Sequence, residues 1–273
     1  MATPELATRL RSNNSGTLRA FDTAFAALSP AEQVKYDLVV AHRWAERWRW
    51  HEGVINHFTA LVPGYRDRFF AIPYGIHWSE VEPDDFITVD LEGTVLEGEG
   101  EIELTSLLIH AAMHRDLPQA EVVLHTHQPN ITALTCLEDQ TLVLCSQHAT
   151  HFIGRIAYLN AYGLATENSI GSLINAAIRE KDILLMANHG VTVCGPTVSI
   201  AFDDLYALDR ACEVQLLAQA TQKKLREIPA SEADELGARA RPKIIEEGDQ
   251  HFRALRRLLW KAEPHLLHGK DQA

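Results

Sequence analysis

The stretch VVLHTHQPN, residues 122–130, places two histidines one residue apart at the end of an apolar run. Successive side chains of an extended strand point to opposite faces, so His125 and His127 are predicted to share one face while Thr126 points away. Two imidazoles on one face can bind the same divalent cation, which needs at least a third ligand from elsewhere in the chain. The stretch therefore predicts a buried strand that ends at a candidate metal site.

A second apolar run supplies the third candidate ligand. In LLMANHGVTVCG, residues 184–195, His189 follows the run, and Gly190 permits the tight backbone that a strand exit needs. Spacing alone leaves two interpretations open, because the three histidines could equally be unrelated imidazoles in the core.

Helical and extended patterns alternate around these two stretches. A helix is predicted from Ser29, as N-cap, to about Arg49, because Pro30 and Glu32 occupy its first turn. Further helices are predicted over residues 105–115, 168–181 and 197–220. Antiparallel strands are predicted in GVINHFTALVPG, RFFAIPYG and DFITVDLEGTVLEG, the last with a turn at Glu92-Gly93. This order indicates a mixed α/β fold without internal repeats.

The length and hydrophobic content favour one compact domain with a C-terminal appendage. The chain has 273 residues, 46% of them hydrophobic, which suffices for a large core. We predict a main domain over residues 1–225 and a helical extension over residues 226–273. The extension contains the amphipathic segment HFRALRRLLW, which is expected to pack on the core or on a neighbouring subunit.

Charge and hydropathy narrow the classes of partner. The net charge of −12 argues against nucleic acid, because a phosphate backbone requires a basic surface. The N-terminal residues are polar, and no apolar run approaches the length of about 20 residues that a membrane span needs. We therefore expect a cytoplasmic protein whose partner is a small-molecule substrate, with neither nucleic acid nor membrane bound.

In its motifs the chain resembles the class II aldolase and adducin family, over roughly Asn56 to Ala220. VVLHTHQPN and LLMANHGVTVCGPTVSIAFDDLYALDRACE resemble the family's histidine doublet and its later NHG histidine. FAIPYGIHWSEVEPDDFITVDLEGTVLEG and LLIHAAMHRDLPQAEVV resemble the segments before the doublet, and the order and spacing of the four matches are specific. The resemblance implies a three-layer α/β/α sandwich with a mostly antiparallel central sheet, assembled as a homotetramer. It also implies that His125, His127 and His189 bind a metal ion.

One position departs from the family pattern. The family's sugar-phosphate aldolases carry a glutamate four residues before a helical histidine; His110 matches that histidine, and Ser106 stands where the glutamate is expected. A serine is a poor metal ligand and a poor base near pH 7, so the catalytic residue is unknown. Glu103 is a candidate for the missing carboxylate, although a solvated surface charge is the alternative interpretation.

Other polar and aromatic side chains have both a functional and a structural interpretation. We expect His110 to be a core histidine bonded to a backbone carbonyl. For six further residues a role in a pocket or beside the metal is one interpretation, and packing or surface placement is the other. They are His77, Trp78, His148, His151, Tyr158 and Tyr162.

Three neutral imidazoles would leave the cation its full charge and an open face. Such a centre suits a hydroxy-carbonyl or keto-acid substrate, whose enediolate it can stabilise, and zinc is the expected metal, with Fe(II) or Mn as alternatives. The sequence thus predicts a metal-dependent lyase-type enzyme. Two alternatives remain open: an oxygenase with iron on three histidines, and a non-catalytic adducin-like scaffold, since adducins also lack the glutamate.

Overall fold

One eight-stranded sheet organises the protein, and its computed structural model describes residues 19–161 and 169–267. The strands lie in the order β4-β3-β2-β1-β5-β8-β7-β6, and every neighbouring pair is antiparallel except β6 and β7. The strands are β1 (His57–Leu61), β2 (Arg68–Ala71), β3 (Ile87–Asp90), β4 (Val95–Glu97), β5 (Val122–Thr126), β6 (Ile156–Leu159), β7 (Ile183–Met186) and β8 (Gly190–Gly195).

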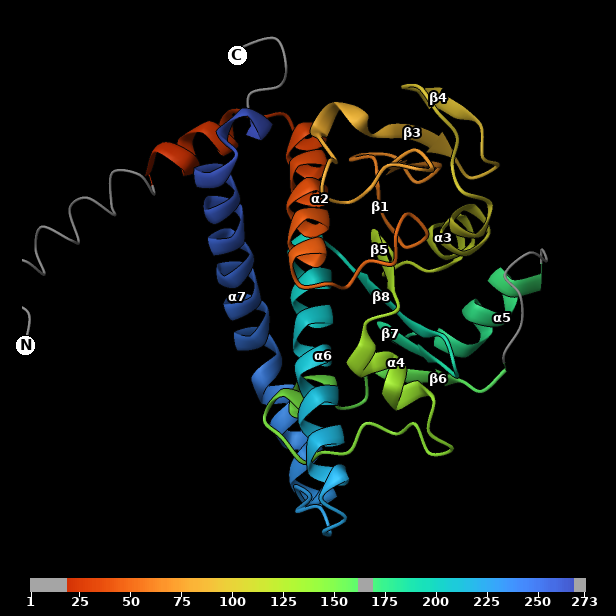
Figure 1. Ribbon diagram of the computed structural model, residues 1–273, viewed down its shortest axis with the longest axis vertical. Coiled ribbons are helices and arrows are strands. Elements are labelled where there is room, and N and C mark those ends of the chain that lie inside the picture. The colour runs from red at the N-terminus through yellow and green to blue at the C-terminus, as the bar shows by residue number, and fades with distance from the viewer. Residues whose placement is uncertain (1–18, 162–168, 268–273) are drawn as a thin grey trace, which may run out of the picture.

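Helices cover both faces of the sheet, so the predicted α/β/α sandwich is confirmed (Figure 1). The helices are α2 (Pro30–Arg47), α3 (Leu104–Asp116), α4 (Pro129–Thr135), α5 (Ser169–Ile178), α6 (Val198–Ala220) and α7 (Ala230–Ala262). The described residues also form the short 3-10 helices η1 (Pro83–Asp85), η2 (His148–Phe152) and η3 (Pro264–Leu267). Helices α3 and α5 pack on one face, whereas α2 and α6 pack on the other.

Local sequence signals position these elements as expected. Ser29 caps α2 in a reciprocal capping box: its hydroxyl accepts from the Glu32 backbone N–H at 3.3 Å, and the Glu32 carboxylate accepts from the Ser29 N–H at 2.7 Å. Between β3 and β4, Gly93 adopts a φ of 91°, which an L-residue adopts only with strain. The predicted helix start and hairpin turn are therefore confirmed.

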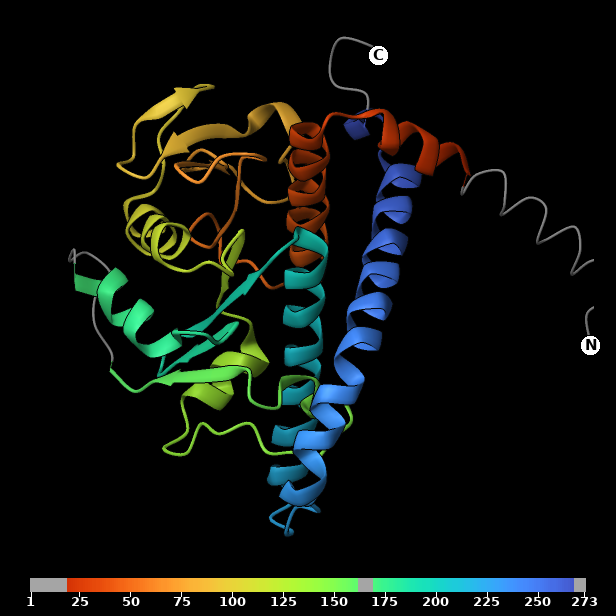
Figure 2. The same cartoon turned by 180° about the vertical axis from the view of Figure 1, so that it is seen from behind.

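Helix α7 lies outside the sandwich, against α6 and α2 (Figure 2). It begins at Ala230, within the segment predicted to be a helical extension, and continues through Pro242. A bidentate ion pair joins α7 to α2, because both Arg256 nitrogens lie 2.6 Å from the carboxylate oxygens of Asp37.

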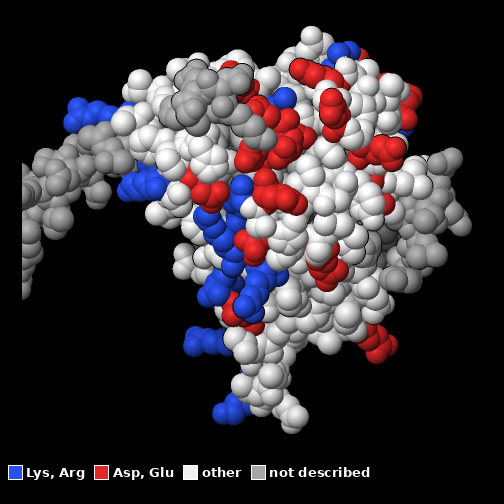
Figure 3. Space-filling model, turned by 45° about the horizontal axis from the view of Figure 1, so that its top comes forward, with Lys and Arg blue, Asp and Glu red and all other residues white. Residues whose placement is uncertain are grey.

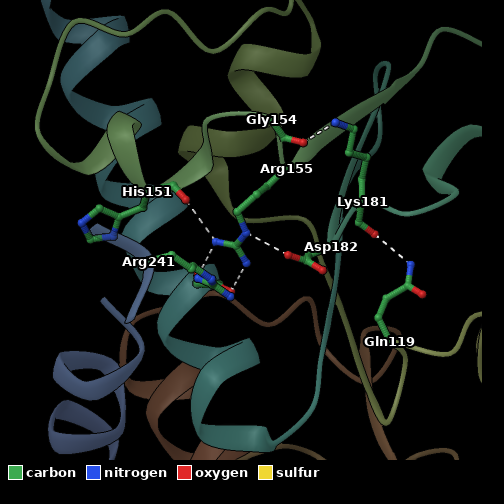
Figure 4. A network of polar contacts seen from close by, with 8 residues as sticks. Gln119, His151, Gly154, Arg155, Lys181, Asp182 and Arg241 are labelled. Atoms are coloured by element: carbon green, nitrogen blue, oxygen red, sulfur yellow. Dashed lines mark hydrogen bonds and ion pairs between the residues drawn. The ribbon is translucent and has the colours of Figure 1, made fainter. Parts of the chain in front are cut away.

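A second ion-pair network, centred on Arg155, ties the opposite end of α7 to the sheet (Figure 4). The Arg155 guanidinium donates to Asp182 at 2.8 Å and to Asp204 of α6 at 2.9 Å. It also donates to the carbonyl of His151 at 3.1 Å, while Arg241 of α7 lies 3.4 Å from Asp204. The Asp204 side chain is only 3% exposed, so its charge depends on these two arginines.

Acidic and basic side chains gather in separate zones of the surface that Figure 3 shows. Part of the basic charge is neutralised locally, since Arg43 and Arg47 of α2 both form ion pairs with Glu263.

Within residues 19–161 and 169–267, every helix is too short or too polar to cross a bilayer.

Candidate metal centre

Pairing of three strands brings the predicted ligands together. His125 lies in β5 and His127 directly follows it, while His189 occupies the turn between β7 and β8. Strand β8 pairs with β5, with Thr126 opposite Val191, which places the turn at the end of β5. Gly190 allows this approach, because a Cβ there would lie 2.4 Å from the Thr126 carbonyl oxygen.

The three imidazoles form one compact cluster. One ligand atom from each of His125, His127 and His189 lies within 4.8 Å of the others, and the ring centroids are 4.6 to 5.0 Å apart. His125 is buried, whereas His127 and His189 are partly exposed, so the cluster has a closed back and an open front. Burial lowers the pKa of His189 to about 4, which keeps this ring neutral and able to bind metal at neutral pH.

Hydrogen bonds at the outer nitrogens decide which nitrogens face the centre. His125 Nδ1 donates to the Val191 carbonyl at 3.0 Å, and His127 Nδ1 donates to the Glu52 carboxylate at 3.0 Å. The two Nε2 atoms therefore both present lone pairs, and they lie only 3.0 Å apart. Two nitrogens on a tetrahedral zinc ion are about 3.3 Å apart, so a cation between them would convert a repulsion into two bonds. The residues present thus fit a divalent metal.

Glu52 is a functional candidate that sequence reasoning missed. It lies in the segment between α2 and β1, and its side chain is 50% exposed. Carboxylates that accept from the outer nitrogen of a histidine ligand fix the ring's orientation and increase its basicity. Only an isolated HEG triplet marks this position in the sequence, and nothing there indicates its partner.

His57 is the second missed residue. It is the cross-strand neighbour of His125 in the β1–β5 register, and the two rings stack with centroids 5.2 Å apart. His57 Nδ1 lies 3.0 Å from His110 Nε2, and His57 Nε2 lies 3.8 Å from the Glu103 carboxylate. A fourth imidazole therefore borders the centre.

Ser106 and Glu103 lie together at the start of α3. Ser106 is buried, and its backbone N–H donates to Glu103 at 2.8 Å, so that Glu103 is the N-cap of the helix. Burial alone raises the pKa of the Glu103 carboxyl, but hydrogen bonds from Thr105 and Ser106 outweigh it and lower the pKa. Glu103 is therefore held ionised, which fits a helix cap better than a proton carrier.

The remaining predicted residues are not members of the three-histidine cluster, and their side chains pack or form hydrogen bonds elsewhere. His110 is fully buried and bonds to His57 and Thr59 rather than to the expected backbone carbonyl. Trp78 is buried against His42 and Phe58, and His77 bonds to Ser79.

His148 and His151 belong to η2, which packs against α6 and α7 rather than against the three ligands. Figure 4 shows His151 beside Arg155 and Arg241. Tyr158 lies in the edge strand β6, where its hydroxyl accepts from the Leu142 N–H at 3.2 Å and borders a cavity of about 360 Å³. Tyr162 lies outside the described residues.

Comparison with known proteins agrees with this architecture. A family model described as the Class II Aldolase and Adducin N-terminal domain matches residues 36–216. The chain is 31% identical over 206 residues to a class 2 aldolase-type protein of Pseudomonas aeruginosa, covering 75% of this chain and 79% of the relative.

Two solved structures are similar over most of their length. An aldolase II superfamily protein from Pseudomonas syringae has a TM-score of 0.80 and 29% identity, covering 89% of this chain and 98% of its own. An L-fuculose 1-phosphate aldolase from Glaciozyma antarctica has a TM-score of 0.76 and 25% identity, covering 85% of this chain and 91% of its own. The chain therefore belongs to the class II aldolase and adducin N-terminal domain family.

Proposed function

We propose that the protein is a divalent-metal-dependent lyase-type enzyme that acts on a small hydroxy-carbonyl or keto-acid substrate through an enediolate. One observation carries the proposal: His125 and His127 direct their Nε2 atoms at each other across 3.0 Å, with both Nδ1 atoms already bonded. A cation between them would accept a lone pair from each nitrogen, which supports a resident metal ion.

His125, His127 and His189 would hold the ion, and zinc is the metal that we propose, with Fe(II) and Mn as alternatives. When bound, the ion would supply Lewis-acid stabilisation of negative charge on the substrate's oxygens. Buried His125 and His57 form the closed back of the centre, while partly exposed His127 and His189 leave access for a small molecule.

We expect a carboxylated substrate rather than a sugar phosphate, because the centre lacks the carboxylate that cleavage of a sugar phosphate would use. Three imidazoles carry no charge that would offset the cation, so an anionic ligand is attracted. Ser106 supplies no carboxylate, and Glu103 is committed to capping α3. The similar L-fuculose 1-phosphate aldolase makes fuculose 1-phosphate the reference substrate, and we expect negligible cleavage of it. Robust cleavage by the unmodified protein would refute this substrate assignment.

Elemental analysis tests the metal centre directly. Purified protein reconstituted with zinc is expected to hold close to one ion per chain, and His127→Ala is expected to lose it. His77→Ala is the matched control, because His77 lies outside the cluster and bonds to Ser79. Metal content far below one, or unchanged content in His127→Ala, would show that the cluster is not a metal site.

Activity assays on the same metal-reconstituted protein distinguish two other functions from the proposed one. A three-histidine site without a carboxylate also suits an iron oxygenase, which would consume dioxygen when loaded with Fe(II). The absence of a glutamate at Ser106 is also compatible with an adducin-like scaffold. Metal-loaded protein that turns over neither keto acids nor hydroxy acids, under zinc or iron, would favour the scaffold.

We further propose that the chain assembles as a homotetramer, because the family's pockets lie between subunits. Light scattering at micromolar concentration tests this assembly, and a stable monomer would refute it. The cytoplasm remains the proposed location, with neither nucleic acid nor membrane as partner.

A further inference from the structure

A line of hydrogen bonds runs from the backbone of Ala120 to the edge of the metal centre. His114 Nδ1 lies 2.7 Å from the Ala120 carbonyl oxygen, and His114 Nε2 lies 2.8 Å from Thr59 Oγ1. Thr59 Oγ1 lies 2.6 Å from His110 Nδ1, and His110 Nε2 lies 3.0 Å from His57 Nδ1. All four side chains are buried, so each of these hydrogen bonds is shielded from water.

The carbonyl at the far end fixes the direction of the whole line, because a carbonyl can only accept. His114 therefore carries its proton on Nδ1. Burial lowers the pKa of His114 to about 4, so the ring is neutral at pH 7 and its Nε2 accepts. The Thr59 hydroxyl must donate to that nitrogen, which leaves the Thr59 oxygen to accept from His110 Nδ1.

The same rule carries the direction to His57. Since His110 donates from Nδ1, its Nε2 accepts, and His57 donates to it from Nδ1. The Nε2 atom of His57 is then unprotonated. The opposite direction would set a lone pair of His114 against the Ala120 carbonyl oxygen at 2.7 Å, with no proton between them.

The unprotonated Nε2 of His57 faces a second acceptor beside the metal ligands. It lies 3.8 Å from the ionised Glu103 carboxylate, while the ring stacks on His125. No side chain or backbone group within residues 19–161 and 169–267 donates a hydrogen bond to this nitrogen. His57 also lies outside the set of three mutually close ligand atoms. Two acceptors at this separation call for a donor supplied by something that enters the site.

We infer that His57 is the hydrogen-bond acceptor for a hydroxyl group of the ligand at the metal centre, with Ala120, His114, Thr59 and His110 holding it in the accepting tautomer. The ligand class is a hydroxy acid or hydroxy-carbonyl compound that donates from its hydroxyl. This ligand role rests on the proposed function, whereas the tautomer of His57 does not.

Nitrogen NMR of metal-free protein labelled with [15N]histidine tests the tautomer. We expect a protonated Nδ1 and an unprotonated Nε2 for His57, assigned by the signals that disappear in His57→Gln. Thr59→Val should break the line and leave His57 in mixed tautomers, whereas Thr88→Val, which removes another buried strand hydroxyl, should not. A proton on His57 Nε2 in the unmodified protein would overturn the inference.

Titration calorimetry of zinc-loaded protein tests the ligand role, with glycolate and its methyl ether, methoxyacetate, as probes. Glycolate is expected to bind about three- to tenfold more tightly, the range for one neutral hydrogen bond. His57→Phe should abolish this preference with zinc content unchanged, whereas His77→Phe should keep it.

Three results are distinguishable. A zinc-loaded protein without the preference, or a His57→Phe variant that retains it, would overturn the acceptor role. Loss of zinc in His57→Phe would instead make His57 a ligand, which also overturns it. Unmodified protein that holds no zinc would overturn the proposed function, and the NMR result would then decide the state of His57 independently.

Discussion

Replacing Glu52 with glutamine should weaken metal binding without unfolding the protein. The carboxylate accepts from His127 Nδ1 at 3.0 Å, and partners of this kind change metal affinity by about 10- to 100-fold when they are removed. The Glu52 side chain is 50% exposed, so water screens its charge and can replace the hydrogen bond. We therefore expect the low end of that range, about tenfold.

Competition of the protein with a chromophoric zinc chelator measures this change at neutral pH. Glu180→Gln is the control, because it removes one exposed carboxylate that lies away from the cluster. The two variants should unfold at the same urea concentration, while Glu52→Gln alone shows weaker zinc binding. Equal zinc affinity in Glu52→Gln and the unmodified protein would refute the orienting role of Glu52.

Three further changes have defined outcomes. Burial lowers the pKa of His42 to about 4, so the folded ring stays neutral while the ring in the unfolded chain takes up a proton below pH 6.5. The free energy of unfolding therefore decreases as the pH is lowered from 6.5 towards 4. His42→Phe should remove about 2 kcal/mol of the decrease between pH 7 and about pH 5, measured by urea unfolding at both pH values. Arg155→Leu removes one of the ion-pair partners of buried Asp204 and should lower the free energy of unfolding by about 3 to 5 kcal/mol in the same assay. The control Arg239→Leu, at an exposed arginine, should lower it by less than about 0.5 kcal/mol. Ser106→Glu should strengthen zinc binding by adding a fourth donor, and unchanged chelator competition would show that position 106 does not face the centre.

Much of the fold and the proposed ligands could be predicted because their signals are local. Side-chain alternation in a strand placed His125 and His127 on one face, and the capping residues Ser29 and Glu32 marked the start of α2. The NHG motif marked His189 because a glycine is needed where two backbones approach closely. Each of these signals occupies a few consecutive residues.

The residues around the ligands could not be predicted, because their roles depend on distant partners. His57 borders the centre only through the β1–β5 register, and a shift of one residue would turn it to the opposite face. Glu52 reaches His127 across 75 positions of the chain, and no periodic pattern surrounds it. The direction of the hydrogen bonds through His114 and His110 likewise depends on tertiary contacts alone.

The antiparallel pairing of β5 with β8 also makes the histidine cluster a reporter of folding order. His125 and His189 are 64 positions apart, and they meet only after β7, β8 and β5 have associated. Closing such a long loop is slow compared with forming α2 or α6, whose contacts are local. In a stopped-flow refolding experiment with cobalt in place of zinc, the visible absorption of the bound ion should therefore appear after most helical circular dichroism has returned. The absorption of the bound ion would thus report when β5, β7 and β8 pair.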